Sequence, residues 1–156
     1  MTAYIGLRLG ALYLALPREQ ISQINLPTDM HQHLGIACVR LAHQRIPVLQ
    51  VDDRLSRVCA AQPHSSANYI ISLAYADASG ALLTRFALQV ETVHKLADLQ
   101  IRPIPDQMQR RNSPLLGIFT DGAKQHGFIT DVVALETFVN HYIEVHSHDH
   151  DYPMAG

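Results

Sequence analysis

The side chains best suited to metal chemistry gather at the end of this sequence. His146, His148 and His150 alternate there with other polar residues, among them Asp149 and Asp151. Imidazole and carboxylate groups are accepted ligands of transition metals. A structural metal site also needs fixed geometry and outer hydrogen bonds, whereas we expect residues 146–156 to form a flexible tail. We therefore predict no functional metal site and no cofactor, and keep metal handling by this tail as an alternative function.

The other candidate catalytic groups lack the partners that catalysis requires. Asp52-Asp53 are adjacent, and neighbouring side chains on a strand point to opposite faces, so they would not share a proton. A solvated turn or a cap is the simpler role for them. Ser65-Ser66 lies outside any Gly-x-Ser-x-Gly sequence, and the eight glycines form no phosphate-binding loop. We expect His31 and His33 to be solvated loop residues, and we predict that the protein is not an enzyme.

Charge and composition also exclude several partners. The net charge is −2, and basic residues come close together only at Arg110-Arg111 and at Arg54 and Arg57. Two neighbouring arginines do not make a phosphate track, so we predict no nucleic-acid binding. No apolar run approaches the roughly 18 residues of a membrane span, and the first residues do not resemble a secretory signal. Two cysteines form no disulfide framework, and the apolar neighbours of Cys38 predict a buried thiol. We expect a cytoplasmic protein without membrane insertion.

The elements that would position these residues are mainly short strands. Turn compositions at Leu9-Gly10, Asp77–Gly80 and Asp121-Gly122 predict three hairpins. Pro47 indicates an edge position or a bulge in its strand. Residues 21–24 fit either a strand or one helical turn, and residues 30–34 fit a loop or a short helix. The remaining expected strands are residues 36–41, 45–51, 69–75, 81–90, 115–120 and 126–130.

One helix is expected near the end, over residues 131–145. Asp131 is a suitable N-cap, and an apolar face follows it at helical spacing: Val132, Leu135, Phe138, Val139 and Tyr142. About nine short strands before this helix favour small β-barrels. The polar, small-residue stretch at residues 59–68 is the best candidate for a connection between two lobes.

The order of these segments resembles the CheW-like domain of bacterial chemotaxis coupling proteins, over roughly residues 4–138. Leu9-Gly10 followed by Ile21–Ile24 resembles the first hairpin of the family and the segment after it. Arg45–Val51 resembles a strand with a central proline. Further similar segments are Phe86–Val93, Ile101–Pro105, Leu115–Gly122 and Gly127–Leu135, of which Ile101–Pro105 is the closest match.

The resemblance implies a mainly β fold, made of two interlocked five-stranded SH3-like barrels with a C-terminal helix, in one domain over residues 1–145. It implies a scaffold without an active site that bridges a CheA-type histidine kinase, through its regulatory domain, and the cytoplasmic tip of a chemoreceptor. A receptor helix would dock in an apolar groove between the lobes. The implied groove positions are Ile21, Gln23, Ile24, Tyr69, Val93 and Leu96, for which core packing is the alternative; Gln23, between two isoleucines, should face outward.

One segment departs from the family pattern. Where the family carries Asn-Leu-Arg-Gly, this chain has Arg40-Leu41-Ala42-His43. Ala42 cannot hold a carboxylate, and with His43 in place of the glycine the turn should not freely use positive φ. Arg40 shares a strand face with position 42 and could replace the lost charge. The departure also favours an alternative function, in which a diverged CheW-like domain has lost receptor coupling and binds another protein or itself.

Overall fold

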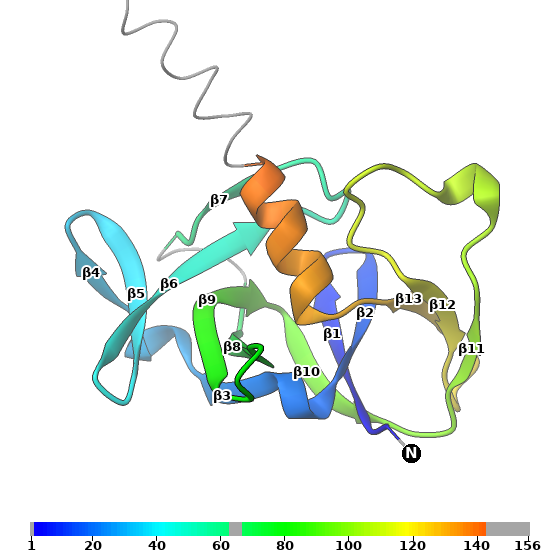
Figure 1. Ribbon diagram of the computed structural model, residues 1–156, viewed down its shortest axis with the longest axis horizontal. Coiled ribbons are helices and arrows are strands. Elements are labelled where there is room, and N and C mark those ends of the chain that lie inside the picture. The colour runs from blue at the N-terminus through cyan, green and yellow to red at the C-terminus, as the bar shows by residue number, and fades with distance from the viewer. Residues whose placement is uncertain (1, 63–66, 143–156) are drawn as a thin grey trace, which may run out of the picture.

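A computed structural model describes residues 2–62 and 67–142 of the chain (Figure 1). Within these residues the chain forms thirteen strands, three short 3-10 turns and a helix over residues 132–142. The 3-10 turns are η1 (Arg18–Gln20), η2 (Pro27–Asp29) and η3 (Asp106–Met108). The strands are β1 (Tyr4–Leu9), β2 (Leu12–Pro17), β3 (Ile21–Asn25), β4 (His31–His33), β5 (Ile36–Leu41), β6 (Gln44–Val51), β7 (Val58–Ala60), β8 (Tyr69–Ala76), β9 (Leu82–Val90), β10 (Thr92–Leu96), β11 (Gln100–Arg102), β12 (Gly117–Thr120) and β13 (His126–Ile129).

The strands form two sheets that interlock along the sequence. A six-stranded sheet has the order β10-β1-β2-β13-β12-β11, and a seven-stranded sheet has the order β3-β8-β9-β6-β5-β4, with β7 also paired to β6. The six-stranded sheet thus takes its strands from both ends of the chain, and the other sheet comes from the part between. One parallel pairing joins distant segments in each sheet, β2 with β13 and β6 with β9.

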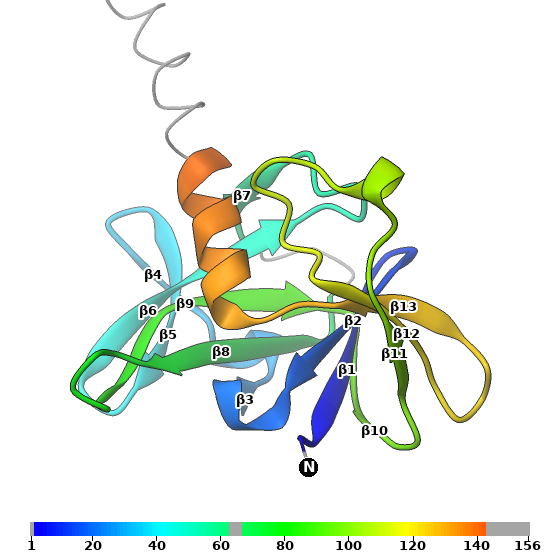
Figure 2. The same cartoon turned by 45° about the vertical axis from the view of Figure 1, so that its right-hand side comes forward.

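The main hydrophobic core lies between the two sheets and is covered by the helix (Figure 2). Alternate residues of the central strands face it, as the two-residue repeat of a strand requires. On β2, for example, Leu12, Leu14 and Leu16 enter the main core, whereas Tyr13 and Ala15 enter a smaller cluster on the opposite face. The central strands are therefore buried on both faces.

Local signals set the hairpin turns and the helix start as predicted. Gly10, in the β1–β2 turn, has a φ of 61°, which glycine adopts at little cost. Asp77 and Asp121 accept backbone hydrogen bonds within the β8–β9 and β12–β13 turns. The Asp131 carboxylate accepts a hydrogen bond from the N–H of Ala134 at 2.7 Å, so the predicted N-cap is confirmed.

The predicted apolar face of the helix is also confirmed. It is buried in the main core through four side chains, with Tyr142 partly buried beside them; the four are Val132, Leu135, Phe138 and Val139. Residues 143–145 of the expected helix lie outside the described residues. Among the residues described, no helix is long and apolar enough to cross a membrane.

The expectation of closed five-stranded barrels is not met by the strand pairing. The sheets contain six and seven strands, and no pairing between described residues joins the two end strands of either sheet. The structure has more strands than the sequence predicts because three of them, β4, β7 and β11, are only three residues long. Strands this short leave little hydrophobic pattern in a sequence. The first two residues of the connection expected near residues 59–68 belong to β7, and the next described strand is β8, in the same sheet. The division into two lobes stays a prediction.

Two further local expectations were wrong. His31 and His33 do not lie in a loop or a short helix but in β4, which pairs with β5. The tight turn between β5 and β6 does use a positive φ, at Ala42 (55°), whereas His43 does not. Pro47 behaves as expected, because it lies where β6 pairs with β5, before the pairing with β9 begins at Val48.

Candidate functional site

A groove of about 510 Å³ runs between the end strands of the two sheets. β3 ends the seven-stranded sheet and β10 ends the six-stranded sheet, and both lie on the side of the molecule opposite the helix (Figures 1 and 2). The groove is lined by residues from β1, η1, β3 and β10: Ile5, Arg18, Ile21, Ser22, Gln23, Ile24, Val93, His94 and Lys95.

The groove combines apolar side chains with cationic ones. Ile21 and Val93 are half-buried and pack against the main core, while the side chain of Ile24 is 52% exposed. Arg18 and Lys95 add two positive charges, and no acidic residue is among the described lining residues. Such a surface suits an amphipathic segment whose apolar face enters the groove and whose acidic residues meet the rim.

Gln23 lines the groove and is half-buried, so it does not belong to the core. The pairing of β3 with β8 shifts by one residue between Ile21 and Gln23, which is a β-bulge. Gln23 donates a hydrogen bond from Nε2 to the backbone oxygen of Arg40 at 2.9 Å, and it also bonds Asn25. Ser22 and Ile24 are the exposed residues of this strand, so Ile24 supplies its exposed apolar surface.

His94 connects the groove with a partly buried polar network. Its Nε2 lies 2.8 Å from the hydroxyl of Tyr13, which donates a hydrogen bond to Asp121 at 3.0 Å. Because a tyrosine hydroxyl has only one hydrogen, His94 donates from Nε2 in this arrangement. Burial, and then the bond to Asp121, raise the pKa of Tyr13 to about 12. Gly6 leaves room for the imidazole, since a Cβ there would lie 2.8 Å from it.

The remaining predicted docking residues lie elsewhere. Tyr69 is half-buried against the main core, and Leu96 packs beside the smaller core of the six-stranded sheet. Arg40 is exposed at the end of β5 and faces Arg45 across the strand pair, and Ala42 and His43 form the exposed turn that follows Leu41. The groove thus brings together Ile21, Gln23, Ile24 and Val93, but not the other six predicted positions.

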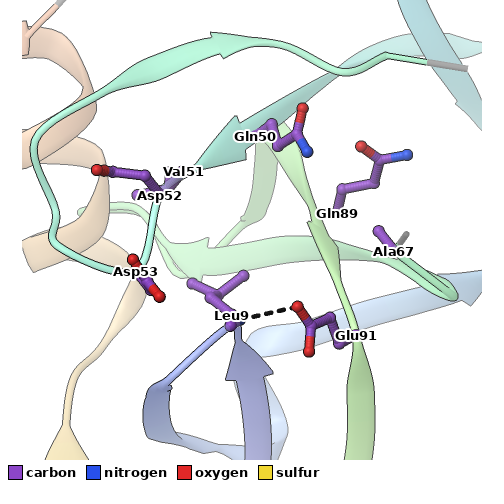
Figure 3. Close-up of a pocket in the computed structure, with 9 residues that line it drawn as sticks. Leu9, Gln50, Val51, Asp52, Asp53, Ala67, Gln89 and Glu91 are labelled. Carbon is purple, nitrogen blue, oxygen red and sulfur yellow. Dashed lines mark hydrogen bonds between the residues drawn. The ribbon is translucent and has the colours of Figure 1, made fainter. Parts of the chain in front are cut away.

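A second, more polar cavity of about 170 Å³ holds both aspartates of the adjacent pair (Figure 3). Asp53 accepts a hydrogen bond from the N–H of Ala11 at 3.2 Å, and Glu91 accepts one from Gly10 at 3.0 Å. These carboxylates hold the β1–β2 turn against the other sheet. Gln89 is 2% exposed, and its Oε1 has no hydrogen-bond partner among residues 2–62 and 67–142.

Asp52 holds a turn of its own. Burial alone would raise the pKa of the Asp52 carboxyl, but hydrogen bonds from Ser56 and Arg57 together lower it. Asp52 and Asp53 therefore serve separate backbone segments, as the sequence prediction of a turn or cap requires. Among the described residues no group of three metal-ligating side chains occurs; the histidines of residues 146–156 lie outside those residues.

Comparison with solved structures identifies the fold. The scaffolding protein TtCheW from Thermoanaerobacter tengcongensis matches with a TM-score of 0.56 and 17% sequence identity, covering 83% of this chain and 88% of that chain. This chain has a CheW-like fold. No family model matches the sequence, and no curated protein matches it. The CheW-like fold of this chain is thus recognised by its structure and by the order of its segments, at an identity too low for the comparison to assign residue roles.

Proposed function

We propose that this chain is a non-enzymatic scaffold of chemotaxis-type signalling, located in the cytoplasm, which bridges a CheA-type histidine kinase and a chemoreceptor. The receptor tip would place a helix in the groove between β3 and β10, and the kinase would bind through its regulatory domain. The two sheets would correspond to the two SH3-like lobes of the family.

The observation that carries this proposal is the groove within a CheW-like fold. The solved protein that shares the fold is described as a scaffolding protein. In this chain, four of the six groove positions implied by the family resemblance line one continuous surface. That surface has an exposed isoleucine and a cationic rim, which are features of a docking surface for a helix with apolar anchors.

The decisive experiment is a binding assay of the full chain against two immobilised partners from the same organism, the kinase regulatory domain and the receptor tip. Ile24→Glu places a carboxylate on the apolar part of the groove, and we expect it to weaken receptor binding by at least about tenfold. Leu82→Glu is the matched control, because Leu82 is 72% exposed and does not line the groove.

The outcomes separate the alternatives. Receptor binding that is lost in Ile24→Glu and kept in Leu82→Glu supports the proposal. Wild-type protein that binds neither partner refutes it. If both variants weaken receptor binding equally, the receptor does not bind in the groove.

A second candidate function is a diverged CheW-like domain that binds another protein or itself. It is favoured by Ala42, which stands where the family carries an arginine and adopts a φ of 55° at the tip of an exposed turn. A methyl side chain cannot pair with a carboxylate of a receptor. Binding of the kinase domain, or self-association, without receptor binding would support this candidate.

A further inference from the structure

A pocket of about 420 Å³ lies on the helix side of the molecule. Three segments that are distant in sequence form it: the turn after β6, the loop over residues 103–116 and the last described turns of the helix. Figure 2 shows this loop arching beside the helix. Leu55, in the pocket wall, has a positive φ of 54°, a conformation that is costly for a leucine.

The pocket is lined by an unbalanced set of charges. Arg54, Arg110 and Arg111 border it together with His141, and no acidic residue is among the described lining residues. The ion pair found among the described residues joins Arg85 and Glu136, so the three arginines have no carboxylate partner there. In the sequence Arg54 lies far from Arg110-Arg111. The fold brings Arg54 to Arg110-Arg111, and like charges gathered in this way repel one another unless an anion joins them.

Apolar side chains form the floor between these charges. Leu55, Leu115 and Tyr142 pack against the main core, so their inner faces are held in place. Phe138 belongs to the core itself, and Met108 is 46% exposed at the edge of the pocket. A flexible methionine beside a fixed apolar floor accommodates varied apolar side chains of a partner.

We infer that this pocket binds an acidic segment of a partner protein, with an apolar anchor residue on the floor and carboxylates on the arginines. Arginine presents a planar fork that matches a carboxylate, and charge complementarity selects the acidic partner. A nucleic-acid backbone fits less well, because it would leave the apolar floor unused and three arginines make no continuous track.

The pocket and the groove lie on opposite sides of the chain. The helix is at the top of both overall views, and β3 and β10 are at the bottom (Figures 1 and 2). Two proteins could therefore bind at the same time without competing for surface. The inference does not depend on what occupies the groove, and the two sites are tested by different variants.

Fluorescence anisotropy with two labelled peptides tests the inference. The first is Glu-Glu-Leu-Phe-Glu-Glu, and in the second every Glu is replaced by Lys. We expect the acidic peptide alone to bind the full chain. The double variant Arg110→Glu/Arg111→Glu should bind it at least about tenfold more weakly. Arg45→Glu, at the opposite end of β6 from the pocket, reverses one charge outside the pocket and should bind like the wild type. Met108→Gln should weaken binding without any change of charge.

Several results would overturn the inference. One is equal binding of the acidic and basic peptides, and another is equal weakening by Arg45→Glu, which would indicate a general charge effect. Displacement of the peptide by inorganic phosphate, but not by sodium chloride of the same ionic strength, would make the pocket an anion site instead. Loss of binding in Ile24→Glu would place the peptide in the groove.

Discussion

Gly127 offers a direct test of how tightly the six-stranded sheet is packed. It lies in β13 opposite Phe119 of β12, which is fully buried and meets the ring of Tyr13 edge to face at 5.0 Å. A Cβ at position 127 would lie 2.5 Å from two ring carbons of Phe119 and 2.6 Å from the backbone oxygen of Tyr13. Alanine is too large for this space unless the sheet or the ring moves.

The magnitude follows from two opposing effects. Overpacking a core costs about 1–3 kcal/mol, and the upper end applies because one of the atoms met belongs to the backbone of the neighbouring strand. Replacing glycine by alanine also raises the free energy of unfolding by about 0.5–1 kcal/mol, because it lowers the conformational entropy of the unfolded chain. We therefore expect Gly127→Ala to lower the free energy of unfolding by about 2 kcal/mol, or the melting temperature by about 4–8 °C for a chain of this size.

Urea unfolding followed by circular dichroism measures this change. Gly122→Ala is the control, because its Cβ would meet nothing closer than 3.6 Å, and it should change stability by less than about 0.5 kcal/mol. Combining Gly127→Ala with Phe119→Leu removes the two ring carbons, so the double variant should lose less than the sum of the single losses. A Gly127→Ala protein with the wild-type unfolding midpoint would refute this reasoning.

Three more predictions concern the helix cap, the tyrosine and the exposed arginine. Asp131→Ala removes the bond to the N–H of Ala134 and should cost about 1 kcal/mol in urea unfolding, whereas Asp131→Asn should cost less; equal losses would contradict the capping role. The raised pKa of Tyr13 stabilises the fold below the unfolded value of 10.0, and this contribution is lost as the pH rises toward about 12. Stability measured on both sides of pH 10 should therefore fall in the wild type, and an equal fall in Tyr13→Phe would count against the assignment. Arg40→Ala should weaken partner binding relative to Arg45→Ala, and an affinity equal to that of the control would remove Arg40 from the docking surface.

The parts of the fold that could be predicted from sequence are those set by neighbouring residues. Gly10, Asp77 and Asp121 mark turns through their own backbone chemistry, and Asp131 marks a helix start. The parallel pairings of β2 with β13 and β6 with β9 could not be predicted, because they join segments far apart in the chain. The positive φ of Ala42 was missed because tertiary pairing of β5 and β6 imposes it on a residue that disfavours it.

The groove was predicted in part for a similar reason. Ile21, Gln23, Ile24 and Val93 were found through the resemblance to a family, and all four line the groove. The cationic rim was missed. Arg18 and Lys95 are unremarkable in the sequence and become neighbours only because β3 and β10 end two different sheets.

The interlocked order of the two sheets has a consequence for synthesis on the ribosome. β2 emerges early, but β13, its second neighbour, begins only at His126. Every strand of the seven-stranded sheet has by then been made, so that sheet can assemble while the first hairpin still has an open edge. Pairing of such distant segments slows folding, and an open edge in a nascent chain invites aggregation. A chain that stops before His126 would therefore lack not just its last strands but the support that holds its first ones.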